Sequence, residues 1–369
     1  MKEGKYFNYD YLKQVREIPL FFMASFFKTK RIRNPKRILI INPCLIGDIA
    51  ASLPAIRAYI KKRKYAKIDI MVPLPMKSVL EKVKGINKVY VTKSAINRKI
   101  ENIKIPNQEM DELMRNHYDS VLVIRMSEEA YDVLKKIKTR NIKISPFKFL
   151  KYALHLSKVL FDEGKRKQYQ KANFEWIGER YTDMKFNDIF NFSKKDYAEI
   201  KKIPEMRGRE KKIIIHAGRG WKKSWESKKW VELVSRINKM GNYKFIFIGG
   251  DKKEEREFIK IQNSLNFRIY SLIKKINLAQ LLLIMRSSNY FIGIDSGPRN
   301  IAHLADLRSI GLLGPGPKHF MPTNKKDIII NKSDCRCTHL FCLKRKECMK
   351  KISVNDVFEA FQKLEGKGK

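Results

Sequence analysis

Four short polar segments of the chain each follow a run of apolar residues typical of a buried β-strand. They are residues 45–48, 216–223, 249–251 and 295–298. Loops that follow strands commonly carry binding and catalytic groups, because a rigid scaffold positions them. In open α/β sheets, ligands bind at the carboxyl ends of the strands. The placement of the four segments therefore predicts that ligands bind at these strand ends.

The segment Asp295-Ser296-Gly297-Pro298 stands between an apolar strand and a predicted helix. Ser296 suits the N-cap of that helix, and Pro298 suits its first turn. The exposed N–H groups at a helix N-terminus favour a phosphate group. The alternative is a plain helix cap, which the local sequence taken alone favours.

The segment 216–223 carries cations that suit a diphosphate. Arg219, Lys222 and Lys223 follow a buried strand, and fixed cations stabilise the negative charge that develops on a leaving nucleoside diphosphate. Because the chain is rich in lysine, cations in a loop are not distinctive by themselves. More unusual is that three of the four tryptophans lie around these cations in the sequence: Trp221, Trp225 and Trp230.

Asp48 lies in the first segment, at the mouth of a predicted strand-to-helix loop. A carboxylate there suits a general base that deprotonates an acceptor hydroxyl. It equally suits an exposed carboxylate at a helix terminus.

Common enzyme signatures do not occur in the chain. It holds no G-x-x-x-x-G-K-[ST], G-x-G-x-x-G, H-E-x-x-H or D-x-D motif. P-loop kinases, common dinucleotide-binding enzymes, zincins and D-x-D transferases therefore lack their signal. A single-displacement transfer without a metal or a cofactor stays open.

The five cysteines are too few for a secreted disulfide scaffold of this length, which favours a reducing compartment. Four of them follow a C-x-C-x4-C-x5-C pattern with His339 between them: Cys335, Cys337, Cys342 and Cys348. Four thiolates could hold zinc, but C-x-C differs from the C-x2-C of ordinary structural sites. A metal, a disulfide and unpaired thiols packed near a C-terminal helix all stay open.

Apolar runs that alternate with helical patterns predict an α/β fold. In the first half, we expect strands at residues 37–42, 67–73, 89–92 and 119–125, a helix after residue 48 and a short helix over 107–115. In the second half, we expect helices over 227–240, 254–265 and 276–288. We expect strands at 211–218, 244–250, 290–297 and 308–314, and the strand at 308–314 should be the last in the chain. Residues 126–200 show no clean strand. This order is typical of parallel sheets, and a stretch rich in Pro, Gly and charge near residue 205 predicts two Rossmann-like domains facing across a cleft.

The 369 residues suggest about two domains, and 43% hydrophobic residues exclude a disordered polyelectrolyte. Lys and Arg number 79 against 38 Asp and Glu, which gives a formal net charge of +41. Such a charge favours an anionic partner: nucleic acid, an anionic membrane surface or a phosphorylated substrate. The drift of an AT-rich genome toward lysine, isoleucine and asparagine explains it equally well.

Residues 1–36 form a distinct segment in which aromatic and aliphatic residues precede six basic residues between Lys28 and Arg37. The apolar stretch 18–27 is ten residues long, roughly half of the ~20 that span a bilayer. The pattern suits an interfacial helix held at anionic lipid. The alternative is a helix packed on the first domain.

Three longer motifs run through the chain: RILIINPCLIGDIAASLPAIRA from Arg37, KKSWESKKWVEL from Lys222 and FIGIDSGPRNIAHLA from Phe291. The first resembles an opening strand and G-D-[VI] loop, the second a K-x-W-P-x-x-x-W-x-x-L segment and the third a D-[ST]-G-x-x-H-x-A-A segment. Together they resemble the heptosyltransferases, the family 9 glycosyltransferases that build the inner core of bacterial lipopolysaccharide from ADP-heptose. The similarity covers residues 37–357 and is weakest over about 126–205.

The resemblance implies a GT-B fold of the α/β class. Residues 37–205 would form an acceptor-binding Rossmann-like domain and residues 206–350 an ADP-sugar-binding one, with the segment 1–36 before them and a C-terminal helix and tail over 351–369. By the match, Asp48 corresponds to the catalytic base, in an acceptor-side loop with Gly47 and Ser52. Transfer would be inverting, in one in-line displacement without a metal.

The resemblance also implies the donor-binding residues. Lys223 corresponds to the lysine that contacts the donor diphosphate, and Gly218 and Arg219 fall on small hydroxylated positions that bind phosphate. The other matched positions are Asp295 for sugar hydroxyls, Ser296 and Gly297 in the phosphate loop, and Glu254 or Glu255 for the ribose.

Two positions depart from the family pattern. The family histidine after D-S-G is Asn300 here, with His303 three residues later, and the proline after K-x-W is Glu226. Asn300 is kept as a donor-binding position, but the resemblance does not fix the donor sugar or its linkage.

The leading hypothesis is a glycosyltransferase, peripheral on the cytoplasmic face of the membrane, that moves a heptose-like sugar from an ADP-sugar to a phosphorylated, lipid-linked acceptor such as lipopolysaccharide core. One alternative is a non-catalytic relative that only binds a sugar nucleotide. Another is the same fold with a UDP- or GDP-sugar donor. A third is a basic nucleic-acid-binding α/β protein, against which stand the dispersed cations and the lack of any RNA- or DNA-binding motif.

Overall fold

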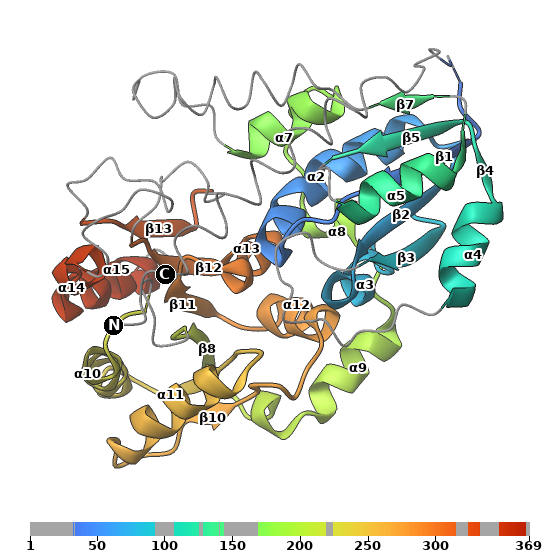
Figure 1. Cartoon of the computed structure of the whole chain (residues 1–369). Helices are drawn as coiled ribbons and strands as arrows, with labels where there is room; N and C mark the ends of the chain where they lie inside the picture. The colour runs from blue at the N-terminus through green and yellow to red at the C-terminus, as the bar shows by residue number, and fades with distance from the viewer. Residues whose placement is uncertain are drawn as a thin grey trace, which may run out of the picture. The chain divides into compact units, whose positions relative to one another are not determined.

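The chain folds into two compact units that divide between Asn191 and Phe192, each built on a parallel β-sheet (Figure 1). The computed structural model describes residues 32, 34–92, 107–124, 128–139, 141–143, 169–218, 224–314, 324–332 and 347–366. The segment expected to bind membrane, residues 1–36, lies almost entirely outside the described residues.

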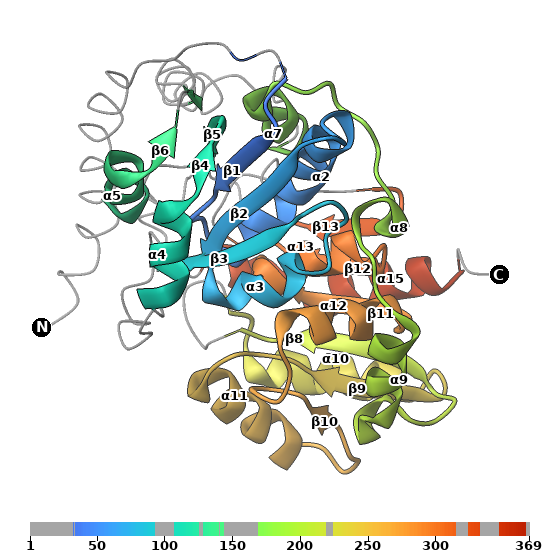
Figure 2. The same cartoon turned by 90° about the vertical axis from the view of Figure 1, so that its right-hand side faces the viewer.

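The first unit holds a sheet of five strands in the order β3-β2-β1-β5-β7. They are β1 (Arg37–Ile41), β2 (Lys67–Pro73), β3 (Lys88–Thr92), β5 (Ser120–Val123) and β7 (Ile142–Lys143), and every pairing is parallel. Figure 2 shows β3, β2 and β1 side by side. A separate parallel pair joins β4 (His117–Tyr118) to β6 (Lys138–Thr139).

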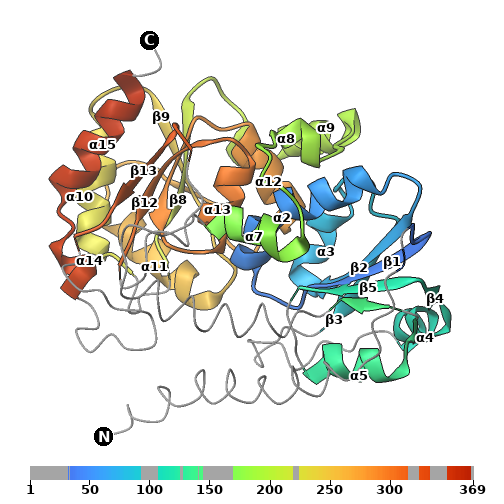
Figure 3. The ribbon, with the colours of Figure 1, turned by 90° about the horizontal axis from the view of Figure 1, so that it is seen from above.

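Helices cover both faces of this sheet, which is why β1 reads as an uninterrupted apolar run. The described helices are α2 (Ile46–Lys62), α3 (Leu74–Leu80), α4 (Asn107–Arg115), α5 (Glu128–Lys136), α7 (Tyr169–Ile177) and α8 (Phe186–Ile189). Leu113 of α4 and Val133 of α5 pack against Leu39 and Ile41 of β1. Figure 3 shows α2 and α7 on the opposite side of the sheet from α5.

The second unit holds a sheet of six strands in the order β10-β9-β8-β11-β12-β13, again with parallel pairing throughout. They are β8 (Lys211–His216), β9 (Tyr243–Phe247), β10 (Tyr270–Ser271), β11 (Tyr290–Ile294), β12 (Arg308–Leu312) and β13 (Asp327–Ile330). The described helices are α9 (Lys194–Lys202), a 3-10 turn (Pro204–Met206), α10 (Ser227–Asn238), α11 (Lys252–Asn263), α12 (Leu278–Arg286), α13 (Gly297–Leu304), α14 (Glu347–Lys351) and α15 (Val354–Gly366).

The core of the second unit lies mainly between its sheet and the helices α10, α11 and α15. Leu233 of α10, Ile261 of α11 and Phe361 of α15 are fully or almost fully buried against Ile213 and Ile215 of β8. Figure 3 shows α12 and α13 on the other side of the sheet. Both faces are therefore covered, as in other all-parallel sheets.

Each sheet has one point at which the strand order reverses. In the first, β1 lies between β2 and β5, and in the second, β8 lies between β9 and β11. Helices on the two sides of such a strand leave it in opposite directions, which opens a crevice at its carboxyl end. The expected ligand sites thus lie after β1 and after β8.

Most expected elements are confirmed, including β2 over residues 67–73 and α4 over 107–115. The expectation that residues 308–314 form the last strand is wrong, because β13 follows and pairs with β12. The stretch 126–200 does contain β7, a short strand at the edge of the first sheet. The stretch near residue 205, where the sequence predicts the division between the two domains, forms a 3-10 turn within the second unit, and the two compact units divide between Asn191 and Phe192.

Two of the clustered tryptophans belong to the core. Trp225 is 2% exposed and Trp230 is fully buried, with their rings 5.0 Å apart and perpendicular. The Trp225 indole N–H donates to the Ile352 carbonyl at 2.9 Å, which ties the start of α10 to the segment before α15. Their clustering reflects packing, and Trp221 lies outside the described residues.

Candidate active site

The loop after β1 carries Gly47 and Asp48 into the first turn of α2. Asp48 is partly exposed, and Leu45, at the N-cap, provides no side-chain cap. A carboxylate in the first turn of a helix is stabilised by the helix dipole. Asp48 is therefore an acidic residue just after β1, the strand at which the order of the first sheet reverses.

Ser52 lies behind this loop. Its side chain is buried, its hydroxyl donates to the Ile49 carbonyl at 2.8 Å, and it accepts from the side-chain amide of Asn42 at 3.2 Å. Asn42 is fully buried after β1. Ser52 therefore braces α2 against the end of β1, and its contact with an acceptor remains a prediction.

Strand β8 ends with a histidine, and the loop after it requires a glycine. His216 ends the strand and is 4% exposed. Gly218 has a φ of +87°, and a Cβ there would lie 2.4 Å from Ile294 Cδ1 of the neighbouring strand β11. Only glycine fits a turn with this conformation and this close approach.

Ser296 occupies the N-cap position of α13 but does not cap the helix. Its hydroxyl oxygen lies 2.9 Å from His216 Nδ1 and 3.1 Å from the Ile294 carbonyl oxygen. The interpretation as a plain helix cap is therefore wrong. The partly exposed residues Asp295, Gly297 and Asn300 flank Ser296 at the start of α13.

Glu254 is held inside the loop after β9. It is the third residue of α11, and its Oε2 accepts from the backbone N–H groups of Gly250 at 2.6 Å and Asp251 at 3.1 Å. Its Oε1 lies 3.0 Å from His216 Nε2. Glu255, the other candidate for the ribose, is partly exposed and paired with Lys274 at 3.1 Å. A ribose contact by either glutamate remains a prediction.

Glu254, His216 and Ser296 thus form a hydrogen-bonded row across the ends of three adjacent strands, β9, β8 and β11. Figure 1 shows β8 and β11 with α11 and α13 near them. His216 was not among the residues singled out from the sequence. The available signal is a histidine that ends an apolar strand directly before a glycine-containing turn.

Behind α13, Arg299 is fully buried and forms an ion pair with Asp327 of β13 at 3.3 Å. His303 Nδ1 lies 3.2 Å from the same carboxylate. Burial alone would raise the pKa of Asp327, but the hydrogen bond from His303 and the charge of Arg299 outweigh it, and the net pKa is lowered. This cluster fixes α13 to the edge of the sheet.

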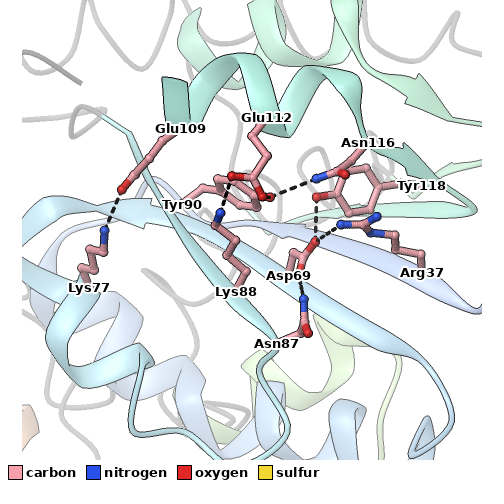
Figure 4. Close-up of polar contacts among 10 residues, drawn as sticks. All are labelled: Arg37, Asp69, Lys77, Asn87, Lys88, Tyr90, Glu109, Glu112, Asn116 and Tyr118. Carbon is pink, nitrogen blue, oxygen red and sulfur yellow. Dashed lines mark hydrogen bonds and ion pairs between the residues drawn. The ribbon is translucent and has the colours of Figure 1, made fainter. Parts of the chain in front are cut away.

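In the first unit, a separate polar cluster lies at the amino end of the sheet, which is opposite to the end that carries the Asp48 loop (Figure 4). Asp69 is fully buried and accepts from Tyr118 Oη at 2.8 Å, Asn87 Nδ2 at 2.7 Å and Arg37 Nη2 at 3.3 Å. Burial, followed by the hydrogen bond to Asp69, raises the pKa of Tyr118. Because these partners satisfy the carboxylate and the cluster lies away from the strand ends that carry the loops, we assign it to stability.

Several predicted site residues lie outside the described residues: Arg219, Lys222, Lys223, Cys335, Cys337 and Cys342. Among the cysteines that the structure describes, Cys44 and Cys348 are buried and not disulfide-bonded. No group of three or more His, Cys, Asp or Glu side chains within the described ranges is arranged to hold a metal ion. None of the helices in the part of the chain that the structure covers is long and apolar enough to cross a membrane.

Sequence comparison decides the family. The sequence model of glycosyltransferase family 9 (heptosyltransferase) matches residues 133–353, which is more than half of the chain. The chain belongs to this family. The predicted family and enzyme class, a glycosyltransferase, are therefore confirmed. The matched range contains the loops after β8, β9 and β11, whereas Asp48 lies before it.

Individual proteins similar to this family 9 glycosyltransferase are themselves heptosyltransferases or members of family 9. Lipopolysaccharide heptosyltransferase 1 of Campylobacter coli is 24% identical over 351 residues, which cover 89% of this chain and 99% of the relative. The crystal structure of a family 9 glycosyl transferase from Veillonella parvula DSM 2008 matches with a TM-score of 0.71 and 17% identity, over 91% of this chain and 99% of that one.

The E. coli heptosyltransferase WaaC, solved with ADP-2-deoxy-2-fluoro heptose, matches with a TM-score of 0.59 and 14% identity, over 89% of this chain and 99% of that one. At such identities, a structural likeness shows the fold alone. Together with the two parallel sheets, these likenesses confirm the predicted α/β GT-B fold class.

Proposed function

We propose that this enzyme transfers a heptose or a closely related sugar from an ADP-sugar to a phosphorylated, lipid-linked acceptor such as lipopolysaccharide core. The observation that carries the donor half is the convergence of His216, Glu254 and Ser296 at the strand ends around the reversal point of the second sheet. The names of the Campylobacter coli relative and of the E. coli structure with an ADP-heptose analogue support the choice of substrates.

The donor diphosphate would lie at the start of α13. The N-terminus of a helix attracts anions, because its first N–H groups lack partners within the helix. Ser296 does not cap this helix, and Gly297 has no side chain that would keep a phosphate away. Arg219 and Lys223 would add the cations that stabilise the leaving diphosphate. Asp295 and Asn300 would bind the sugar, and Glu254 or Glu255 the ribose.

The reaction would be one inverting displacement without a metal. Asp48 would take the proton of the acceptor hydroxyl while its oxygen attacks the anomeric carbon of the donor. The bond from that carbon to the diphosphate breaks as the new glycosidic bond forms, and ADP leaves with the bonding electron pair. The partly exposed position of Asp48 at the start of α2 supports this role. We further propose that the enzyme works peripherally at the inner face of the cytoplasmic membrane.

The test is a donor panel with a heptose-deficient lipopolysaccharide core as acceptor. The full-length enzyme is mixed with ADP-heptose, ADP-glucose, UDP-glucose or GDP-mannose, and glycosylated core is detected by mass spectrometry. Thermal unfolding with the matching nucleotides reports binding separately, since a ligand at ~100 times its dissociation constant adds ~2.7 kcal/mol to stability. We expect glycosylated core only with an ADP-sugar and thermal stabilisation only by adenine nucleotides. A preference for UDP or GDP would exclude an ADP-sugar as the donor. Stabilisation by ADP without any transfer would contradict lipopolysaccharide core as the acceptor.

A further inference from the structure

Exposed lysines are concentrated at the amino end of the first sheet. Residues 61–67 read KKRKYAK and run from the last turn of α2 to the first residue of β2. Lys62 and Arg63 pair with the buried carboxylate of Glu179. The other three cations are exposed and have no carboxylate partner within the described ranges: Lys61, Lys64 and Lys67. Together with Tyr65, which lies between them, these three lysines are called the basic edge.

The N-terminal basic stretch of the chain enters the fold beside the basic edge. The backbone N–H of Lys67 donates to the carbonyl of Lys36 at 2.8 Å. The Asp119 carboxylate accepts from the backbone N–H groups of Lys36 at 2.7 Å and Arg37 at 2.9 Å. The Arg37 side chain in turn contacts the buried Asp69 (Figure 4). Because this junction is fixed, the cations that precede Lys36 in the sequence join the fold at the basic edge.

The dipole of α2 accounts for only part of this basic run. Cations in the last turn of a helix are stabilised by its dipole, and the effect falls off within that turn. The helix ends at Lys62, so Lys64 and Lys67 lie beyond it. Tyr65 is 90% exposed, with the Lys64 ammonium 5.5 Å from the centre of its ring. A side chain this exposed contributes little to the core, so a partner outside the chain is needed to bury it.

A bilayer surface fits the basic edge better than nucleic acid does. Lysines near a membrane are attracted to anionic lipid, and a tyrosine ring suits the level of the headgroups. The stretch 18–27, which precedes the N-terminal cations, is mainly apolar and holds four phenylalanines. Such a stretch suits the boundary between headgroups and acyl chains. Binding to the backbone of a nucleic acid depends on cations and makes no use of it.

We propose that the basic edge docks on an anionic bilayer beside the N-terminal segment, and that α2 holds the Asp48 loop away from the lipid. This inference rests on the proposed function. Asp48 lies in the first turn of α2 and Lys61 in the last, about 20 Å apart along the helix axis at ~1.5 Å per residue. An acceptor anchored in the same bilayer reaches Asp48 through sugars that project from the membrane. The acceptor class is therefore a lipid with a projecting oligosaccharide.

Vesicle sedimentation tests the surface without any sugar substrate. The full-length protein is mixed with vesicles of phosphatidylcholine and phosphatidylglycerol, or of phosphatidylcholine alone. The triple variant Lys61→Gln, Lys64→Gln and Lys67→Gln should bind the anionic vesicles about 10- to 100-fold more weakly than the wild type. Tyr65→Ala leaves the charge unchanged and should weaken binding about 3- to 10-fold.

The matched control removes three exposed cations of the second unit: Lys195→Gln, Lys201→Gln and Lys239→Gln. This variant has the same net charge as the triple variant of the basic edge, and its binding should fall less than about threefold because its cations lie elsewhere. Urea unfolding should give all variants the stability of the wild type, since the replaced side chains are exposed.

Transfer assays separate docking from catalysis. With a deacylated, water-soluble core acceptor, the triple variant of the basic edge should keep the kcat and KM of the wild type, because its substitutions lie far from Asp48. With the acceptor embedded in anionic vesicles, its kcat/KM should fall in proportion to the loss of vesicle binding. An equal fall with both acceptors would overturn the docking role.

The remaining outcomes are distinguishable. Vesicle binding by the triple variant within about twofold of the wild type, or an equal loss in the control, would overturn the basic edge as a lipid surface and leave the proposed transferase intact. Tighter binding to random duplex DNA than to vesicles, lost with the same substitutions, would assign the edge to nucleic acid instead. Vesicle binding that depends on the basic edge, without transfer to either acceptor, would overturn the proposed function and leave the lipid surface intact.

Discussion

At the scale of single residues, Asp48 carries the chemistry that we propose. Asp48→Asn keeps the size of the side chain but removes the base, so kcat should fall about 100- to 10,000-fold while the affinity for ADP-heptose stays within about twofold. Steady-state kinetics and calorimetry check the two parts. Asp111→Asn, an exposed carboxylate on α4, is the control and should leave both unchanged. A turnover in Asp48→Asn close to that of the wild type would contradict the assignment.

Gly218 shows how one backbone angle limits the donor loop. In Gly218→Ala, the φ of +87° and the approach to Ile294 strain the turn, which should lower the free energy of unfolding by about 1–3 kcal/mol and weaken donor binding. Urea unfolding and ADP titration measure both effects. Gly250→Ala is the matched control, because a Cβ there meets no atom within 4 Å. Equal stability of the two variants would show that the turn tolerates a side chain.

The sequence predicts that most of these residues follow strands, as they do in the structure, but it does not reveal their hydrogen bonds. Ser296 suits a helix cap by local sequence rules, but its hydroxyl donates to the Ile294 carbonyl and contacts His216, 80 positions away in the chain. Similarly, the preference between Glu254 and Glu255 depends on which one turns inward, and both occupy the first turn of α11. Contacts between distant strand ends decide such roles, and local patterns do not contain them.

At the scale of elements, the buried pair Arg299–Asp327 holds α13 to the edge strand β13. Because the pKa of Asp327 is lowered in the folded state, its contribution to stability is present above its unfolded pKa and is lost as the pH falls through the folded value. Asp327→Asn leaves Arg299 buried without its counter-charge and should cost about 3–5 kcal/mol at pH 7. The difference from the wild type should shrink below about pH 4.

Urea unfolding of both proteins at pH 7, 5, 4 and 3 measures this difference. Asp306→Asn is the control: this partly exposed carboxylate pairs with Lys326 at 2.6 Å and with Arg286 at 3.7 Å, and its loss should cost less than about 1 kcal/mol at every pH. A cost for Asp327→Asn that is constant over the whole range would refute the role given to its charge.

Strands can be predicted from the sequence when their own residues are mostly apolar, and they are missed when they form only by pairing with a neighbouring strand. β1 and β2 are apolar along most of their length and are covered on both faces, so their composition reveals them. β13 is the short edge strand DIII, and β7 comprises only two residues, so both depend on a neighbour to become strands. Trp225 and Trp230 look like ligand-binding aromatics beside cations until α15 is seen to cover them.

At the scale of the whole molecule, the net charge of +41 predicts salt-sensitive binding to anionic membranes. Full-length protein should sediment with vesicles containing phosphatidylglycerol, and 0.5 M salt should release most of it. Replacing Lys28, Lys30, Arg31 and Arg33 by Gln should weaken binding at least about tenfold, since each cation near the surface contributes ~1 kcal/mol. Arg37 is left intact because it supports Asp69.

The control for this experiment replaces four exposed cations of the second unit by Gln: Lys195, Lys201, Lys228 and Lys252. This variant has the same net charge as the first, so equal losses of binding in the two would show that total charge, and not the N-terminal segment, holds the protein to lipid. Binding of both variants at wild-type strength would reject membrane attraction by charge.

For the whole molecule, composition alone left nucleic acid, membrane and phosphorylated substrate open, because charge does not distinguish among anions. The family is recognisable from three motifs, which include β1, follow β8 and include most of β11, and their combination is more specific than any one of them. The donor sugar is not predictable in this way. It would depend on the side chains that contact the sugar, and Asn300, which we propose as one of them, departs from the family pattern.

The arrangement of the second sheet also sets an order of events during synthesis. β8 is complete only when it has β9 on one side and β11 on the other, and His216 meets Ser296 across 80 positions of chain. Closing so long a loop is slow compared with pairing neighbours in sequence. A chain emerging from the ribosome can therefore form the Asp48 loop before β11 has been made, whereas the contact between His216 and Ser296 forms only afterwards. Nascent molecules would then carry the proposed acceptor loop before the proposed donor site is complete.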